Sequence, residues 1–182
     1  CLFRNESVRP ILFLSTSSGL GGAVRVISNL GTARDPARYR AVLCLFRQGW
    51  MRERSESRGV RTHIIATCGM TDWRWALRFR RLLDEEHVDL IHAHEFDANV
   101  QGTFVAAISG IPLVATVHGK HYFWEKWRRC LAYRWVSRQA TMVAVSEDLK
   151  QFIVENVGAC PERITVLYNG VDVPMPPRQA EV

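Results

Sequence analysis

Short apolar runs rich in β-branched residues alternate along this chain with segments whose apolar residues recur at helical spacing. Several of the runs are apolar on both faces, which is typical of parallel strands covered by helix layers. We therefore predict strands that alternate with helices. The predicted strands are residues 11–16, 40–46, 61–66, 90–94, 113–118, 141–145 and 164–168.

Residue types favoured at helix ends mark the helices between these runs. Asp72 and Ser146 are predicted N-caps, because their side-chain oxygens can accept a hydrogen bond from the first turn, and Gly110 is a predicted C-cap. Further helices are expected to begin in the glycines near residue 21 and to cover residues 97–109 and 122–138. The residues expected to face inward are Ala23, Val26, Ile27 and Leu30 in the first helix, Ala76, Phe79 and Leu83 after Asp72, and Leu149, Phe152 and Ile153 after Ser146.

Repeated strand–helix units on this scale predict an α/β fold with a Rossmann-like, doubly wound parallel sheet. The chain has 182 residues, 47% hydrophobic and 23% charged, which suits one globular domain and excludes a disordered chain. We expect that domain to occupy residues 1–173. Residues 174–182 begin with Pro-Met-Pro-Pro and are expected to start an interdomain linker. Because the chain also opens on Cys1, we expect it to be a piece of a longer protein.

The charge and the cysteine content limit the possible partners and the possible cellular compartment of the protein. The net charge is +6, and basic residues gather between Arg74 and Arg81 and between Lys120 and Arg138. Such patches favour an anionic partner: a phosphorylated small molecule, a membrane surface or nucleic acid. The five cysteines are odd in number and contain no C-x-x-C pair. They argue against a disulfide framework and a zinc knuckle and predict a reducing, cytoplasmic location.

A glycine-rich turn follows the first predicted strand and opens the first helix. Gly21 and Gly22 let backbone N–H groups approach a phosphate, which the positive end of the helix dipole also attracts. The dinucleotide fingerprint needs another glycine where Val24 stands and an acid where Phe46 and Arg47 stand, so a NAD site is disfavoured. No Gly-Lys-Ser/Thr follows, which excludes a Walker loop. A tight turn without a ligand is the alternative.

Histidines gather at the ends of two predicted strands. His92 and His94 are two residues apart and therefore share a face of their strand, and His118 and His121 follow the next strand. Together with Glu95 they could make a metal site. The alternative for His92 is a hydrogen-bonded core histidine. His94 and His118, at the strand tips, are better placed to meet a substrate.

Two further patterns can be explained without a catalytic role. Glu147 and Glu155 form an E-x7-E pair on an amphipathic helix, which solvated glutamates explain sufficiently. Tryptophan and arginine stripes on two helices suit the interface of an anionic membrane, but they also suit a core stripe beside a hydrated face. Single-stranded nucleic acid could use the same chemistry, but no RNA-binding signature accompanies it. The stripes are Trp124, Trp127, Leu131 and Trp135 beside Lys126 and Arg129, and Arg74, Arg78 and Arg81 beside Trp73 and Trp75.

Five short motifs follow one another at the ends of the predicted strands. They are GGAVRV at residues 21–26, DLIHAH at 89–94, TVHG at 116–119, VAVSE at 143–147 and YNGVD at 168–172. In this order they resemble the N-terminal half of family-4-like retaining glycosyltransferases of the GT-B fold. The resemblance spans about residues 10–173. Val24 departs from it, since many relatives carry glutamate there.

The resemblance implies a two-domain enzyme whose N-terminal domain mainly binds the acceptor. The C-terminal domain would hold the nucleotide-diphosphate sugar and the functional E-x7-E motif of the family. Backbone amides, rather than a metal or another cofactor, would hold the charge of the leaving diphosphate. The implied site residues are His118 as the catalytic residue beside the transferred sugar, Gly21 and Gly22 facing the donor phosphates or the acceptor, His94 and Glu95 on the acceptor side, and Ser146 and Asn169 as further substrate-binding residues.

The predicted function is therefore acceptor binding in a cytoplasmic glycosyltransferase that works with retention in the synthesis of cell-envelope glycan, glycolipid or polysaccharide. We expect contact with an anionic membrane surface, no nucleic acid partner and no turnover by this chain alone. Two alternatives are open. One is a non-catalytic acceptor-binding subunit that needs a separate donor-domain partner. The other is a metal-dependent hydrolase built on His92, His94, His118 and His121.

Overall fold

The computed structural model describes residues 8–16, 19, 21–32, 35–69, 71–122 and 127–170. A seven-stranded sheet forms its centre, in the order β3-β2-β1-β4-β5-β6-β7, and each neighbouring pair is parallel. The sheet confirms the predicted α/β, Rossmann-like fold. Its strands are β1 (Arg9–Ser15), β2 (Tyr39–Leu45), β3 (Arg61–Ile64), β4 (Leu90–His94), β5 (Leu113–Val117), β6 (Thr141–Ala144) and β7 (Ile164–Val166).

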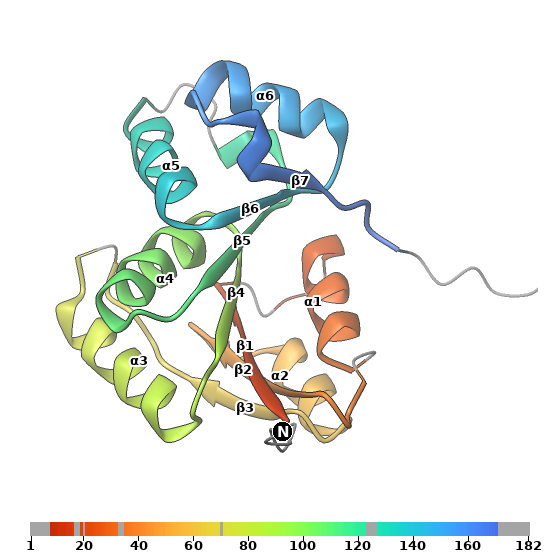
Figure 1. Cartoon of the computed structure of the whole chain (residues 1–182). Coiled ribbons are helices and arrows are strands. Elements are labelled where there is room, and N and C mark those ends of the chain that lie inside the picture. The colour runs from red at the N-terminus through yellow and green to blue at the C-terminus, as the bar shows by residue number, and fades with distance from the viewer. Residues whose placement is uncertain are drawn as a thin grey trace, which may run out of the picture.

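Helices cover the sheet, with α1 on one side and α3 and α4 on the other (Figure 1). None of the described helices is long and apolar enough to cross a membrane. The helices are α1 (Gly22–Thr32), α2 (Trp50–Glu56), α3 (Trp73–Glu85), α4 (Phe96–Ser109), α5 (Trp127–Gln139) and α6 (Glu147–Val157), with 3-10 turns η1 (Lys120–Tyr122) and η2 (Pro161–Arg163).

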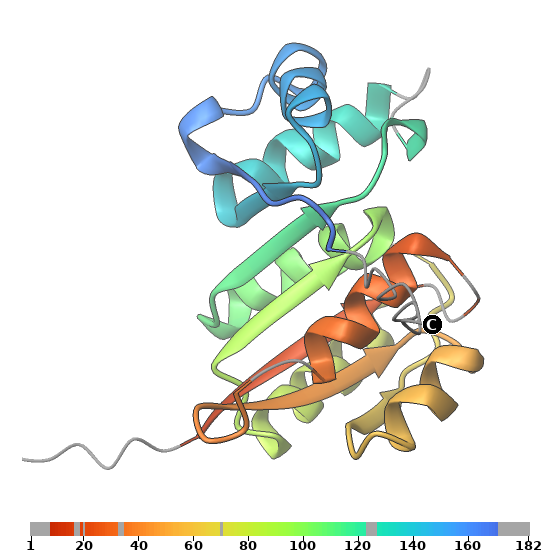
Figure 2. The ribbon, with the colours of Figure 1, turned by 90° about the vertical axis from the view of Figure 1, so that its right-hand side faces the viewer.

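The core has two sides because successive side chains of a strand point to opposite faces of the sheet. On β1, Leu12 and Leu14 belong to a buried cluster with Phe79 of α3. Phe13, between them, packs in a different cluster with Ile27 of α1. Figure 2 shows α1 lying across the near face of the sheet, with the strands behind it. Burial on both faces explains why the central part of β1 is apolar at successive positions.

The predicted helix caps are confirmed. The Asp72 carboxylate accepts from the Trp75 N–H at 3.0 Å and begins α3. The Ser146 hydroxyl accepts from the Leu149 N–H at 3.1 Å and begins α6. Gly110 ends α4 with φ 69°, in the left-handed region that glycine adopts without strain.

Some predictions need correction. The helix α2 was not predicted. The strands need little correction, because every predicted strand agrees with the observed one to within two residues at each end. The buried face of α1 is turned from the predicted one, since Val24, Ile27, Ser28 and Gly31 are buried and Leu30 is 37% exposed. The helix predicted at 122–138 is η1 followed by α5, and Trp124, Lys126 and the linker at 174–182 lie outside the described residues.

Candidate functional site

The candidate site lies at the carboxyl edge of the sheet, where the strand order reverses. β1 pairs with β2 on one side and with β4 on the other. The connections from β1 and β4 lead into α1 and α4, which leave the sheet toward opposite faces (Figure 1). Ligands of doubly wound sheets bind at such a reversal, outside the carboxyl ends of the strands.

Glu95 joins the ends of β1 and β4 at this point. Its side chain is buried, and its carboxylate accepts from the Ser15 hydroxyl at 3.1 Å and from the Thr16 N–H at 3.0 Å, with a further bond from the Thr16 hydroxyl. Glu95 also has φ 72°, a conformation that non-glycine residues rarely adopt. A strained backbone and a buried carboxylate together hold the start of the glycine-rich turn against β4.

The histidines form a row across β4 and β5. The rings of His92 and His94 have centroids 4.1 Å apart, as expected for residues on one face of a strand. His94 Nδ1 and His118 Nε2 share a hydrogen bond of 3.1 Å. His92 Nε2 pairs with the Thr116 hydroxyl at 2.8 Å, so His92 has the bonded, largely buried position that the core alternative describes.

Burial keeps these histidines neutral. It lowers the pKa of His92 to about 4, with the nearby His118 as a second cause. Burial, and then the neighbouring histidines, lower the pKa of His94 well below 6.5. Burial also lowers the pKa of His118, although the charge of Glu95 opposes the shift. At neutral pH each ring therefore has one donor and one acceptor nitrogen.

Two nitrogens of this pair are buried without a protein partner among the described residues. They are His94 Nε2 and His118 Nδ1. Because one ring must donate to the other, the tautomer of His94 decides whether His118 Nδ1 is a donor or an acceptor. Unsatisfied buried polar atoms are costly and cluster where a ligand completes them.

The glycine turn is open above its backbone. A Cβ placed on Gly21 or Gly22 would have no atom within 4 Å. The Gly21 carbonyl accepts from the Arg25 N–H at 3.1 Å and starts the helical ladder. Val24 is buried against the core of that face. Backbone N–H groups at the start of α1 are thus approachable by a phosphate.

The other residues singled out by the sequence lie on other elements. Ser146 is committed to capping α6, and Asn169 is exposed after β7. His121 is exposed and its ring lies 2.8 Å from where a Cβ on Gly119 would be. Glu147 and Glu155 are exposed on α6. Among the described residues, no three His, Cys, Asp or Glu side chains are grouped to hold a metal ion.

One buried polar residue of the site was not predicted. Asn99 of α4 donates to the Thr116 carbonyl at 3.0 Å and to the Tyr133 hydroxyl, which joins α4 to β5 and α5. It lies four residues after Glu95, one helical turn away. The amide and hydroxyl residues Asn99, Gln101 and Thr103 in the first half of α4 were the available signal.

Comparisons with known proteins identify similar chains. A family model described as Glycosyltransferase Family 4 matches residues 20–174. No curated protein sequence gives a match. Among solved structures, HepE of Anabaena in complex with UDP has a TM-score of 0.76 at 23% identity, covering 90% of this chain and 44% of that one.

Two more structures extend the comparison. A glycosyltransferase from Rickettsia africae has a TM-score of 0.74 at 14% identity, with 91% of this chain and 44% of that chain covered. The apo form of the lipopolysaccharide outer core galactosyltransferase WaaB has a TM-score of 0.65 at 17% identity, with 94% and 50% covered. This chain therefore spans half or less of their length, and at these identities the likeness concerns the fold.

Proposed function

Because the chain belongs to glycosyltransferase family 4, we propose that it forms the acceptor-binding domain of an enzyme that moves a sugar from a nucleotide-sugar to an acceptor. The family match over residues 20–174 carries this proposal. The unsatisfied histidine pair at the reversal of the strand order supports it. The match favours neither the metal hydrolase nor the non-catalytic subunit.

The start of α1 suits the diphosphate of the donor. HepE is described in complexes with UDP and with UDP-glucose, and a donor of that class carries its negative charge on the leaving diphosphate. The open backbone at Gly21 and Gly22 and the positive end of α1 would stabilise that charge as it develops. Backbone amides do this without a metal ion.

His118 is the residue that we assign to the reacting sugar. Its neutral ring would hydrogen-bond a sugar hydroxyl through Nδ1, while the bond to His94 fixes its orientation. A neutral ring positions the sugar without adding a charge beside the leaving group. Transfer would then proceed with retention, the acceptor hydroxyl attacking from the face that the diphosphate leaves.

The setting of this reaction is the inner side of a membrane. The outer surfaces of α3, α4 and α5 carry exposed aromatic and aliphatic side chains, and α3 and α5 also carry arginines. We propose that this surface touches an anionic membrane and that the acceptor belongs to cell-envelope glycan, glycolipid or polysaccharide synthesis. We call this surface the α3–α5 face.

An assay of the protein together with its donor domain tests the assignment. With UDP-sugars and candidate acceptors, we expect His118→Ala to lower kcat by about a hundredfold or more, the usual loss of a transition-state contact. His87→Asn, an exposed histidine with φ 50° that asparagine tolerates, is the control and should keep kcat. This chain alone should give no sustained transfer. An unchanged kcat in His118→Ala, or turnover by the chain alone, would contradict the proposal.

A further inference from the structure

Three neighbouring helices expose pairs of large apolar side chains. In each pair the residues are four positions apart, so each helix carries one apolar stripe on its outer surface. The six side chains are between 51% and 66% exposed. Figure 1 shows α3 beside α4, and α5 continuing the same layer. The pairs are Trp73 and Leu77 on α3, Phe104 and Ile108 on α4, and Trp127 and Leu131 on α5.

A cavity of about 360 Å³ opens between these helices. This volume is at the lower end of small-ligand sites, which measure about 300–1,000 Å³. Thr71, Asp72 and Gln101 add polar groups to its lining. The apolar walls are Trp73, Trp75 and Ala76 of α3, Val100 and Phe104 of α4, and Trp135 of α5.

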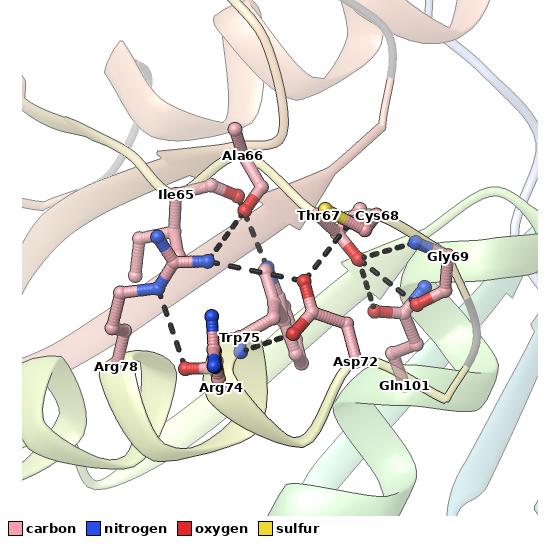
Figure 3. Close-up of polar contacts among 10 residues, drawn as sticks. All are labelled: Ile65, Ala66, Thr67, Cys68, Gly69, Asp72, Arg74, Trp75, Arg78 and Gln101. Carbon is pink, nitrogen blue, oxygen red and sulfur yellow. Dashed lines mark hydrogen bonds and ion pairs between the residues drawn. The ribbon is translucent and has the colours of Figure 1, made fainter.

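Several polar groups around this cavity are bonded within the protein (Figure 3). The Trp75 indole N–H donates to the Ile65 carbonyl at 3.1 Å. The Asp72 carboxylate caps α3, and the Thr67 hydroxyl donates to the Gln101 side chain at 3.4 Å. Because these groups are occupied, the cavity offers a ligand aromatic and aliphatic surface. Such a lining suits a hydrocarbon and gives a sugar few partners.

The charge of the flanking helices is complementary to an anion. α5 carries four arginines and no acid, and α4, between the flanking helices, has Asp97 as its charged residue. The Arg74 guanidinium lies 5.6 Å above the ring of Trp73, which lines the cavity. The Arg78 guanidinium already donates to the Ala66 carbonyl at 2.8 Å (Figure 3), so Arg74 is the better placed of the two for a ligand.

We propose that this cavity takes one acyl chain of an anionic phospholipid from the bilayer that the α3–α5 face touches, with the lipid phosphate at Arg74. The apolar walls exclude water from the chain, and the exposed pairs around the opening lie among the neighbouring acyl chains. The inference rests on the membrane contact proposed above and is independent of sugar transfer. It places one lipid in a defined site on a surface that otherwise binds the bilayer as a whole.

Trp75 provides the decisive readout because it lines the cavity and is only 1% exposed. In a variant whose other tryptophans are replaced by Phe, vesicles of phosphatidylglycerol with brominated acyl chains should quench Trp75 fluorescence. Bromine quenches at contact, so a face that only rests on the bilayer would leave Trp75 unquenched. Ala76→Phe, which fills the cavity, should abolish the quenching while vesicle binding persists.

A second measurement keeps the test valid if the tryptophan variant does not fold. In the otherwise unchanged protein, dihexanoyl phosphatidylglycerol below its micelle concentration should bind saturably. Ala76→Phe and Val100→Phe should each weaken that binding at least tenfold. Ala132→Phe, at a half-buried alanine of α5 that does not line the cavity, is the matched control and should keep it.

The outcomes separate the two proposals. Vesicle binding without quenching of Trp75, or quenching that survives Ala76→Phe, overturns the cavity site and leaves the membrane contact standing. Absence of vesicle binding overturns both. Equal binding of phosphatidylcholine and phosphatidylglycerol in their short-chain forms overturns the role of Arg74.

Discussion

Glu95 combines a strained backbone conformation with a buried carboxylate. Replacing it with alanine would remove the carboxylate oxygen that accepts from the Ser15 hydroxyl and the Thr16 N–H. We expect Glu95→Ala to lower the free energy of unfolding by about 3 kcal/mol, since bonds to a buried charge are the costlier ones to lose. Glu95→Gly loses the same bonds but accommodates φ 72°, so it should be about 1 kcal/mol less destabilising than alanine.

Urea denaturation of the Glu95 variants measures both differences. Glu85→Ala, at an exposed position near the end of α3, is the control and should change the free energy of unfolding by less than about 0.5 kcal/mol. If Glu95→Ala were as stable as the control, the carboxylate would not hold the turn.

The neutral histidines make the stability of the fold depend on pH. Unfolded histidine titrates near 6.5, whereas His92 has a pKa of about 4 in the folded protein. Between these values the unfolded state binds more protons than the folded state. The contribution of neutral His92 to the free energy of unfolding is therefore complete above pH 6.5 and is lost as the pH drops toward 4. The lowered pKa values of His94 and His118 act in the same direction.

Urea midpoints at about pH 7.5 and pH 5 test this dependence. We expect a clear loss of stability at the lower pH in the wild type and a smaller loss in His92→Asn, which has no imidazole to protonate. His87→Asn serves as the exposed control and should retain the wild-type loss. Equal losses in His92→Asn and in the wild type would contradict the assignment.

The site residues were predictable in part. The face shared by His92 and His94 follows from strand periodicity, and the strand tips indicated His118. The pairing of His94 with His118 depends on the register between β4 and β5, where His94 lies opposite Thr116. The register between two strands cannot be read from the sequence of either strand alone. The bonds of Asn99 were not predicted because they also depend on how separate elements pack together.

At the scale of elements, α4 depends on a close approach to the sheet. A Cβ on Gly102 would lie 2.9 Å from Leu14 Cδ2 and 3.3 Å from Leu113 Cδ1, and both leucines are buried. We expect Gly102→Ala to destabilise the fold by about 1 kcal/mol, because overpacking outweighs the better helix propensity of alanine. Gly102→Val should be worse.

Gly31 of α1 is the matched control for that substitution. A Cβ there meets no atom within 4 Å, so Gly31→Ala should stabilise the protein by up to about 1 kcal/mol. Urea midpoints of the two alanine variants should therefore move in opposite directions. A stabilising Gly102→Ala would mean that the sheet can move away from α4.

The elements themselves were mostly predictable, and the exceptions have physical reasons. Strands buried on both faces are continuous apolar runs and were found. The seven residues of α2 bury only Met51 and Ser55, too few for a helical period to stand out. In α1, the small residues Ser28 and Gly31 face the core, so hydrophobicity alone misplaced the buried face.

Across the whole molecule, buried polar groups at the two edges of the sheet differ in whether they have protein partners. At the amino edge, buried Glu86 is paired with Arg40 at 2.6 Å and with Arg61 and His63 at 3.0 Å. The pKa of Glu86 is lowered, because these partners outweigh the burial that would raise it. At the carboxyl edge, nitrogens of His94 and His118 lack protein partners among the described residues. This difference between the two edges is what supports the ligand site proposed at the carboxyl edge.

The α3–α5 face makes a prediction that belongs to the molecule as a whole. Trp127 and Leu131 are exposed, so these two members of the predicted aromatic stripe are not core residues. We expect Trp127→Ser combined with Leu131→Ser to weaken binding to phosphatidylglycerol vesicles at least tenfold, since each inserted side chain contributes about 1.5–3 kcal/mol. The free energy of unfolding should change little, because exposed side chains contribute little to it.

Sedimentation with vesicles at low and high salt completes the test. Binding should weaken as salt rises, because screening reduces the attraction between the arginines of α5 and the lipid phosphates. Leu167→Ser combined with Tyr168→Ser removes an equally exposed apolar pair beyond β7, outside the α3–α5 face, and should leave binding unchanged. If both double variants lost binding alike, general hydrophobicity would explain the attraction, and a specific role of the α3–α5 face in membrane contact would have no support.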